Sequence, residues 1–590
     1  MLERQGWKQI LHNKTLIFWV GILSLNFLLF LPHYLIDTDN STFIPLPYTG
    51  GRTFWLFEFL IIRNNADAFR VCIEFFLLVS LVVLLRKRTS WYRFFMVLTL
   101  LLYPIFLLYQ LYEAFYFEAY NTEPLFYSDY LILEELIPLY FLDVLHWKAL
   151  LYVTGALVLF FLLVGSIVYV LRKLLLLAKQ VSFGRYSNIF FGILSVFFLI
   201  TVAKYQFDNR NTLLTFQWFS AKVAENTYYS MESYRWNKNY DPEIAEEAYH
   251  YENVQLHQKP NVYLIAIESY GSLMVNDPYF QPRYDSALQL YEQRLTAQGW
   301  HAVSALSKAP VSGGRSWLSF TSMMCGIKID NHGAFKMMLS SHPDFPSLMR
   351  FFKKQGYRNY RLHPVPNVGS RVPMDLYNRF YAFDRWIYYE DIPYQGDYYR
   401  WLFMPDQYVF NYALEEVVKK ESNEPFFFFF ININSHYPWN LDRLPVYADW
   451  KEMNKPGVVG EFSNNIQKNE DRDDYYLYYR SIEYQLDYLT DYIVRSADEN
   501  SLFILIGDHQ PAVFSTSSFN TPLHIIGKDQ QLIDSFLQYG LQPGLRVNEE
   551  QSAPIQHEGL YSLLVRELAR NYGTDTLHLP PYFPEGITTE

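Results

Sequence analysis

Two apolar stretches of the chain end in side chains that can bind a metal. Residues 261–267 read Asn-Val-Tyr-Leu-Ile-Ala-Ile and lead to Glu268, while residues 502–506 read Leu-Phe-Ile-Leu-Ile and lead, after one glycine, to Asp508 and His509. Near-continuous apolar runs of this length are typical of buried parallel strands. Ligands of open α/β sheets lie beyond the carboxyl ends of the strands. We therefore predict that Glu268, Asp508 and His509 meet at one sheet edge, where they could hold one divalent cation.

Ser316 lies at a predicted helix N-terminus, where its hydroxyl could react with a bound anion. Two glycines precede Arg315 and Ser316 in a turn that should open a helix. At a helix N-terminus, backbone N–H groups and the helix dipole favour an anion. A hydroxyl beside a bound cation there is an activated nucleophile. Ser316 is therefore the candidate nucleophile, with Ser312 and Ser319 as nearby alternatives, and Arg315 could either neutralise phosphate charge or face solvent.

A histidine follows a third apolar run. Residues 426–433 hold five successive phenylalanines and lead to His436 in an Asn-Ser-His-Tyr-Pro sequence. Taken alone, a glutamate after a strand, a Gly-Gly turn, an Asp-His pair or a single histidine is more often a surface or structural feature than a ligand. Their order and joint placement on one sheet edge favour the functional interpretation. Two carboxylates and one imidazole suit Mn²⁺, Mg²⁺ or Zn²⁺, and ligand type does not decide among them.

Alternating strands and helices must position these residues. The pattern predicts helices between the strands, for example at 286–299, 345–356, 406–420 and 473–497. The predicted strands are 261–267, 301–306, 357–362, 426–433, 502–506 and 523–526. This alternation indicates a mostly parallel sheet covered by helices on both faces. Residues 259–590 are long enough to form one large α/β domain.

The first third of the chain has the composition of a membrane domain. Crossing the hydrocarbon core takes about 20 apolar residues of helix. The five candidate spans are 16–36, 71–85, 94–112, 150–171 and 189–203. Basic segments precede the first span and separate the second from the third and the fourth from the fifth, so the positive-inside rule predicts a cytoplasmic N-terminus. An odd number of spans then places the rest of the chain outside, and span length disfavours the alternative of a water-soluble bundle.

The predicted organisation has three parts: a transmembrane domain at 1–204, a segment at 205–258 and an outer α/β domain at 259–590. The middle segment is polar and aromatic, which favours helices along the membrane surface or a plain linker. The 590-residue chain has a formal net charge of −11, which argues against nucleic acid as a partner. Its two cysteines provide no disulfide scaffold.

This order of motifs resembles the alkaline phosphatase and sulfatase-like superfamily, and more closely the membrane enzymes of the lipoteichoic acid synthase type. The resemblance implies that Glu268, Ser316, Asp508 and His509 are the metal ligands, with Ser316 also the nucleophile. His436 would contact the substrate phosphate. Many members have threonine as the nucleophile, but a serine hydroxyl can do the same chemistry. Mn²⁺ is the favoured cation, with Mg²⁺ or Zn²⁺ as alternatives.

The resemblance also implies a substrate site. Arg315, His363 and Arg371 would contact the substrate, the last two where the family binds glycerol phosphate. His524 could be a second metal ligand, as in two-metal relatives, or a structural residue within its strand. The sheet edge would therefore hold one metal ion, or two if His524 is also a ligand.

The implied activity is transfer of a lipid head group, with glycerol phosphate from phosphatidylglycerol favoured, through a phospho-Ser316 intermediate to an envelope glycan or lipid acceptor. The protein would lie in the bacterial plasma membrane with an extracytoplasmic catalytic domain. The alternatives are a phosphoethanolamine transferase, a sulfatase-like hydrolase and a non-catalytic lipid-sensing membrane protein. The first is less favoured because such relatives have several outer-domain disulfides, whereas Cys325 is the only cysteine after residue 204.

Overall fold

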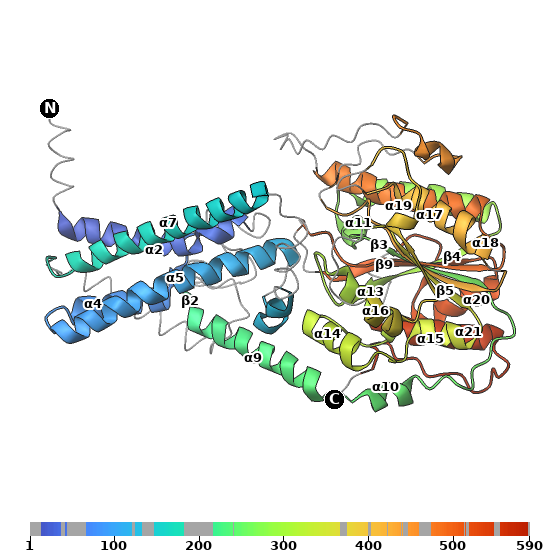
Figure 1. Ribbon diagram of the computed structural model, residues 1–590, viewed down its shortest axis with the longest axis horizontal. Coiled ribbons are helices and arrows are strands. Elements are labelled where there is room, and N and C mark those ends of the chain that lie inside the picture. The colour runs from blue at the N-terminus through green and yellow to red at the C-terminus, as the bar shows by residue number, and fades with distance from the viewer. Residues whose placement is uncertain are drawn as a thin grey trace, which may run out of the picture. The chain divides into compact units, whose positions relative to one another are not determined.

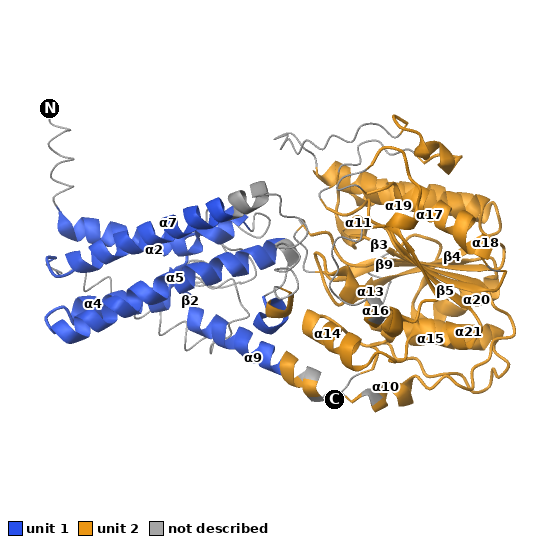
Figure 2. Cartoon of the chain, viewed as in Figure 1, with its two compact units in different colours: residues 1–129, 140–232 blue, residues 130–139, 233–590 orange. Residues whose placement is uncertain are grey.

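The structure of the chain is a computed structural model, and it divides into two compact units (Figure 2). Unit 1 comprises residues 1–129 and 140–232, and unit 2 comprises residues 130–139 and 233–590. The residues that the structure describes are 13–36, 42–43, 67–120, 124–132, 147–181, 184, 216–239, 241–365, 374–398, 403–421, 423–437, 439, 446–458, 474–512, 514, 518–547 and 555–587. One boundary between the units, between residues 232 and 233, falls inside the predicted middle segment.

Among the described residues, unit 1 has three helices that are long and apolar enough to cross a membrane: α2 (Lys14–Ile36), α5 (Thr89–Tyr120) and α7 (Trp147–Leu177). They cover the predicted spans 16–36, 94–112 and 150–171. The predicted span 71–85 forms the shorter apolar helix α4 (Ile73–Leu84), and 189–203 lies outside the described residues. The number of five spans, and the orientation derived from it, therefore stay predictions.

Buried hydrogen bonds connect the helices of unit 1 to one another. Tyr103 of α5 donates to the carbonyl of Leu25 in α2 at 2.8 Å, and Tyr92 of α5 donates to the carbonyl of Leu175 in α7 at 2.9 Å. Outward-facing apolar side chains such as Phe161 of α7 are exposed. A helix that presents apolar side chains outward is suited to lipid rather than water.

The middle segment is partly helical. A short parallel pairing of β1 (Val71–Cys72) with β2 (Phe216–Gln217) precedes α9 (Phe219–Asn239), and α10 (Pro242–Ala248) follows. The first turns of α9 are fixed to unit 1 by Lys222, whose Nζ lies 2.7 Å from both carboxylate oxygens of Glu113. This ion pair is nearly buried, so α9 begins as an integral part of unit 1.

Unit 2 is built on one nine-stranded sheet (Figure 1). The strand order is β10-β4-β9-β8-β3-β7-β5-β6, with β11 also paired to β4. The strands are β3 (Asn261–Ile267), β4 (His301–Lys308), β5 (Arg358–His363), β6 (Arg385–Tyr388), β7 (Phe426–Ile431), β8 (Ser501–Gly507), β9 (Asn520–Gly527), β10 (Gln542–Pro543) and β11 (Ile555–Gln556). All six predicted strands are present, and the short β6, β10 and β11 lie outside the prediction.

The sheet is mixed, and most of its described strands run in the same direction, as predicted. Strands β8, β3, β7, β5 and β6 are parallel, as expected, but β9 pairs antiparallel to both β8 and β4. The physical reason lies in the connection 508–519, whose described residues form no helix. A parallel crossover usually contains a helix, and here the chain turns back beside β8 instead.

Helices cover both faces of the sheet. One apolar core lies under α13 (Ser316–Cys325), α14 (His332–Ser341), α15 (Leu348–Lys354), α20 (Gln530–Ser535) and α21 (Leu560–Tyr572), and the other under α12 (Gln281–Thr296), α17 (Asp406–Tyr412) and α19 (Asp474–Arg495). The helices α11 (Leu273–Asn276), α16 (Met374–Tyr381) and α18 (Lys419–Glu421) complete the unit. The phenylalanine run of β7 serves both cores, since Phe427 and Phe429 enter the first and Phe428 and Phe430 the second. A strand buried on both faces has no polar side.

Candidate metal-dependent active site

Two neighbouring strands deliver the predicted ligands to one point. β3 and β8 are parallel and in register, with Ile267 opposite Gly507, so Glu268 and Asp508 are the next residues on each strand. The Asp508 N–H donates to the carbonyl of Ile267 at 3.2 Å, which continues the ladder by one residue. Single ligand atoms of Glu268, Asp508 and His509 lie within 4.8 Å of one another, and all three residues are buried.

The close approach of the two strand ends depends on Gly507. A Cβ at this position would lie 1.9 Å from the carbonyl oxygen of Tyr270, a backbone atom that cannot rotate away. We expect Gly507→Ala to lower the free energy of unfolding by about 3 kcal/mol or more, because overpacking forces the backbone to shift. The shift would also separate Asp508 from Glu268 and weaken Mn²⁺ binding.

Thermal melting and Mn²⁺ titration of the full-length protein check this prediction. Gly527→Ala is the matched control, since it too ends a strand, but its Cβ would lie 3.2 Å from the side chain of Ile533 and 3.5 Å from the carbonyl oxygen of Ser501, without a backbone clash. Equal losses in the two variants would refute the requirement for glycine at position 507.

Ser316 begins α13, as predicted, because the preceding turn is left-handed. Gly313, Gly314 and Arg315 have φ angles of 68°, 139° and 65°, and the Gly313 N–H donates to the carbonyl of Gln510 at 3.2 Å. The turn is thereby fastened to the segment that follows the metal ligands. A positive φ at Arg315 is unfavourable for a non-glycine residue, and such strain is found where the surrounding structure demands one geometry.

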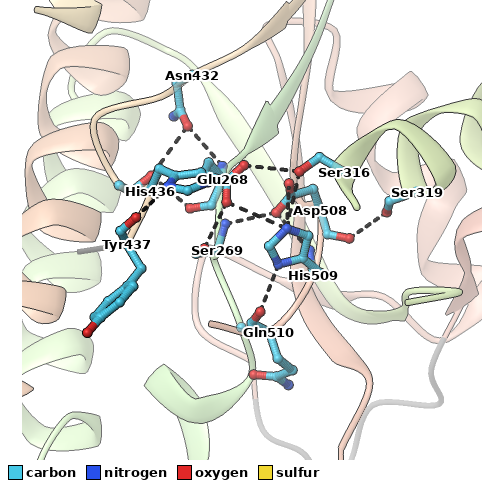
Figure 3. A network of polar contacts seen from close by, with 12 residues as sticks. Glu268, Ser269, Ser316, Ser319, Asn432, His436, Tyr437, Asp508, His509 and Gln510 are labelled. Carbon is cyan, nitrogen blue, oxygen red and sulfur yellow. Dashed lines mark hydrogen bonds and ion pairs between the residues drawn. The ribbon is translucent and has the colours of Figure 1, made fainter. Parts of the chain in front are cut away.

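The Ser316 hydroxyl lies among the candidate ligands (Figure 3). Its Oγ donates to Glu268 Oε2 at 3.1 Å and lies 3.2 Å from His509 Nε2. Ser319, one of the two alternatives, instead donates to the backbone carbonyl of Asp508. Of these hydroxyls, Ser316 is therefore the one that reaches the carboxylate side chains.

His509 is oriented by a backbone contact. Its Nδ1 lies 2.7 Å from the carbonyl oxygen of Gln510, which can only accept, so Nδ1 carries the proton. Nε2 is then left with a lone pair that faces Glu268 Oε1 at 3.5 Å and Asp508 Oδ2 at 3.3 Å. A hydrogen bond of this kind fixes the tautomer of metal-binding histidines.

The electrostatics of the group fit a cation. Asp508 Oδ1 accepts from the N–H groups of Ser269 and His509, both at 2.8 Å, whereas Oδ2 is buried and accepts no hydrogen bond from the described residues. Burial and then the charge of Glu268 raise the pKa of Asp508 well above its ordinary value. An unpartnered carboxylate oxygen, a second carboxylate and an imidazole lone pair together suit a divalent cation.

The loop that carries His436 also holds Glu268 from its other side, through Asn432 and Ser435, to which the sequence analysis gave no role. Asn432 Oδ1 accepts from the Glu268 N–H at 2.9 Å, and Ser435 Oγ donates to the Glu268 carbonyl at 2.7 Å. The next residue is His436, whose Nδ1 donates to the carbonyl of Tyr437 at 2.5 Å. Figure 3 shows His436 and Ser316 on either side of Glu268. Polar residues directly after an apolar strand were the sequence signal for this loop.

The predicted substrate residues are only partly described. His363 ends β5, and its ring is half-buried beside Trp386 and Tyr388. Burial and then the charge of Arg361 lower the pKa of His363 to about 4, so at neutral pH it could bind a hydroxyl but would not supply positive charge. Arg315 immediately precedes Ser316 and is half-buried. Arg371 lies outside the described residues.

His524 is a structural residue in this geometry. Its Nε2 lies 2.8 Å from Tyr270 Oη and its Nδ1 lies 2.7 Å from Ser304 Oγ, so both ring nitrogens have hydroxyl partners. His557 is similar, with Nδ1 2.8 Å from Ser307 Oγ and Nε2 donating to the carbonyl of Gly507 at 3.0 Å. Burial is the main reason that the pKa of each histidine is lowered, to about 3.

These two neutral histidines predict acid lability. Between pH 6.5 and about 3 the unfolded chain binds protons at His524 and His557 that the folded chain does not bind, so their contribution is complete above pH 6.5 and is lost as the pH falls. Each should lower the free energy of unfolding by about 1.4 kcal/mol per pH unit in this window. Unfolding of the full-length protein at pH 5 to 7 in a chelator checks the slope. The variant His524→Gln should show a shallower slope, and an unchanged slope would contradict the prediction.

Comparison with known proteins gives a match to a family model in unit 2. Residues 260–537 match the family model described as Sulfatase. The matched residues include β3, the turn before Ser316, the His436 loop and the Asp508–His509 pair.

Individual relatives are distant. The chain is 24% identical over 185 residues to a protein of Rhizobium meliloti (strain 1021) named "Putative cyclic beta-1,2-glucan modification protein"; the match covers 30% of this chain and 25% of that protein. The chain thus spans a quarter of the length of this curated relative.

Solved structures of similar fold include membrane enzymes and their outer domains. The lipoteichoic acid synthase LtaP of Listeria monocytogenes is 12% identical, with 55% of this chain and 78% of that chain covered and a TM-score of 0.34. The integral membrane protein lipooligosaccharide phosphoethanolamine transferase A (EptA) of Neisseria meningitidis is 14% identical, with 84% and 89% covered and a TM-score of 0.41. The phosphoglycerol transferase GacH of Streptococcus pyogenes is 14% identical, with 57% and 78% covered and a TM-score of 0.32.

Proposed function

We propose that the protein is a metal-dependent membrane phosphotransferase that moves a phospho-head group from a lipid, through a covalent phospho-Ser316, to a hydroxyl of an envelope glycan or lipid. Glycerol phosphate from phosphatidylglycerol is the favoured group. The observation that carries the proposal is the Ser316 hydroxyl, which lies at a helix N-terminus 3.1 Å from Glu268 Oε2 and 3.2 Å from His509 Nε2.

The proposed metal site consists of Glu268, Asp508 and His509, with Ser316 beside them. A divalent cation in this site, with Mn²⁺ favoured, would neutralise phosphoryl charge and lower the pKa of a neighbouring hydroxyl. The N-terminus of α13 adds backbone N–H groups that favour the same anion. Arg315, next to Ser316, is the candidate for additional positive charge.

In the first half-reaction, Ser316 Oγ attacks the phosphorus in line. The Oγ–P bond forms and the P–O bond to diacylglycerol breaks. The proton of Ser316 passes to solvent, and the diacylglycerol oxygen receives a proton for which His436 is the candidate donor. In the second half-reaction an acceptor hydroxyl attacks the same phosphorus and the Oγ–P bond breaks. His436 takes the proton of the acceptor, and Ser316 Oγ takes a proton from solvent.

A lipid donor is favoured by the apolar helices of unit 1. α2, α5 and α7 are long enough to span a bilayer, and a site tethered to a membrane meets its lipid at a raised effective concentration. Among head groups, glycerol is favoured by a neutral His363, which could bind a hydroxyl. A glycan acceptor is consistent with the name of the Rhizobium relative.

The second candidate is a sulfatase-like hydrolase, in which water takes the place of the acceptor. It is favoured by the match to the sulfatase family model, which covers the whole site. A phosphoethanolamine transferase would use the same site and differ only in the head group that it accepts. A non-catalytic lipid sensor is opposed by the intact group of Glu268, Asp508 and His509, which such a protein would have no need to keep.

The experiment uses the purified full-length protein in detergent with Mn²⁺. Phosphatidylglycerol and phosphatidylethanolamine are offered separately, and diacylglycerol release is measured beside Ser316→Ala. Release from phosphatidylglycerol that requires Ser316 supports the proposal, and release from phosphatidylethanolamine alone moves the head group to phosphoethanolamine. No release from either lipid, with Mn²⁺ bound, would overturn the phospholipid assignment.

A further inference from the structure

A fully buried carboxylate stands behind the His436 loop. Asp406 is the first residue of α17 and has no exposed surface. Its Oδ2 accepts from the N–H groups of Ile433 at 3.0 Å and Asn434 at 2.7 Å, and from Gln485 Nε2 of α19 at 2.7 Å. Three donors from two different elements thus converge on one side chain.

The contact is reciprocal. Asn434 Oδ1 accepts from the Asp406 N–H at 2.7 Å, and Asn434 Nδ2 donates to the carbonyl of Met404 at 3.2 Å. The loop and the start of α17 therefore hold each other through both side chains and both backbones. A carboxylate at the first position of a helix is also favoured by the helix dipole.

The other side of the same loop holds the candidate ligand Glu268. Asn432 and Ser435 contact the N–H and the carbonyl of Glu268, and Trp439 Nε1 donates to the Ser435 carbonyl at 2.8 Å. His436 follows directly, and its own N–H donates to the carbonyl of Ile433 at 3.0 Å. The path from Asp406 to His436 thus runs through Ile433, a residue that both contact.

We propose that Asp406 is a positioning residue that fixes the loop 432–436 and so holds His436 beside Glu268 and the substrate phosphorus. This inference rests on the proposed function for its kinetic test, but its structural test does not. Glu268 is additionally fixed by the β3–β8 ladder, whereas the contacts of the loop to Asp406 are made through Ile433 and Asn434. Loss of Asp406 should therefore affect proton transfer at His436 more than metal binding.

The decisive variant is Asp406→Asn, which keeps the shape of the side chain. An amide has one accepting oxygen, so one of its NH₂ donors would face an N–H of the loop or of Gln485. We expect kcat for diacylglycerol release to fall about 10- to 100-fold, because small displacements of reacting groups have effects of that size. The KM for the lipid and the affinity for Mn²⁺ should change less than about threefold.

The matched control is Glu567→Gln in α21. Glu567 is also a fully buried carboxylate, and it accepts from Tyr539 Oη and Arg570 Nε without contacting the loop. This variant should lose stability but keep its kcat per folded molecule. Equal falls in kcat for the two variants would overturn the positioning role.

Hydrogen exchange supplies the readout that does not depend on activity. In Asp406→Asn the amides of 432–436 should exchange faster than in the wild-type protein, while those of β8 stay protected. In Glu567→Gln the loop should be unchanged. Unchanged exchange in the loop of Asp406→Asn would overturn the inference, whereas an inactive wild-type protein with faster loop exchange in the variant would count against the proposed function alone.

Discussion

Ser316→Ala is expected to lower the rate of diacylglycerol release by about 10⁴-fold or more while leaving the protein folded and able to bind Mn²⁺. Removal of a nucleophile has effects of this size because no other group can form the covalent bond. The three remaining ligands, Glu268, Asp508 and His509, should retain most of the metal affinity. Rates with phosphatidylglycerol, Mn²⁺ titration and thermal melting measure the three quantities.

Ser269→Ala is the matched control for this variant. Ser269 Oγ also donates to Glu268, at 2.9 Å to Oε1, but the residue is 2% exposed and lies after β3 rather than at a helix N-terminus. Its loss should lower the rate by about 10- to 100-fold, as expected for one hydrogen bond to a charged group. If Ser269→Ala abolished release and Ser316→Ala did not, the nucleophile would be misassigned.

The second large effect is expected at Asp508, where one substitution should weaken metal binding but raise the melting temperature of the metal-free protein. Asp508→Asn should weaken Mn²⁺ binding by about 100-fold or more and abolish activity, because a charged ligand is lost. In a chelator, however, the same variant should melt a few degrees higher than the wild-type protein. The reason is that Asp508 Oδ2 is buried without a hydrogen bond beside the charge of Glu268, and removing an unpaired buried charge is favourable.

A carboxylate with only a structural role should not give a higher melting temperature when it is replaced by its amide. Glu567→Gln removes a buried carboxylate that is hydrogen-bonded to Tyr539 and Arg570, so its melting temperature should fall with or without metal. A metal-free Asp508→Asn protein that melts lower than the wild type would contradict the view that Asp508 is kept for a cation.

The strand ends could be predicted from the sequence because burial on both faces leaves a clear pattern. After their first residues, Asn261 and Ser501, the β3 and β8 runs are apolar up to Glu268 and to Gly507, and the first polar residues after them mark the sheet edge. Helix formation at Ser316 was also predictable, because the Gly-Gly turn supplies the positive φ angles that precede it. The direction of β9 was not, since it depends on the path of a loop rather than on a local pattern.

The supports of the site were also beyond prediction. Asp406 lies 27 residues before Ile433 and 79 before Gln485 in the chain, and such contacts follow from tertiary packing. Asn432 and Ser435 could be noticed only as polar residues after a strand, with no indication that both contact the backbone of Glu268. The sequence alone left His524 open as a metal ligand or a structural residue. Its two hydroxyl partners come from strand pairing and side-chain packing, which the sequence does not show.

The central claim, a covalent phospho-Ser316, is tested most directly by trapping it. The full-length protein with Mn²⁺ is mixed briefly with phosphatidylglycerol in the absence of an acceptor, quenched in acid, digested and measured by mass spectrometry. The account predicts one phosphoglycerol group on the peptide that contains Ser316, in proportion to the diacylglycerol released in the first turnover. Diacylglycerol release with that peptide unmodified would contradict it.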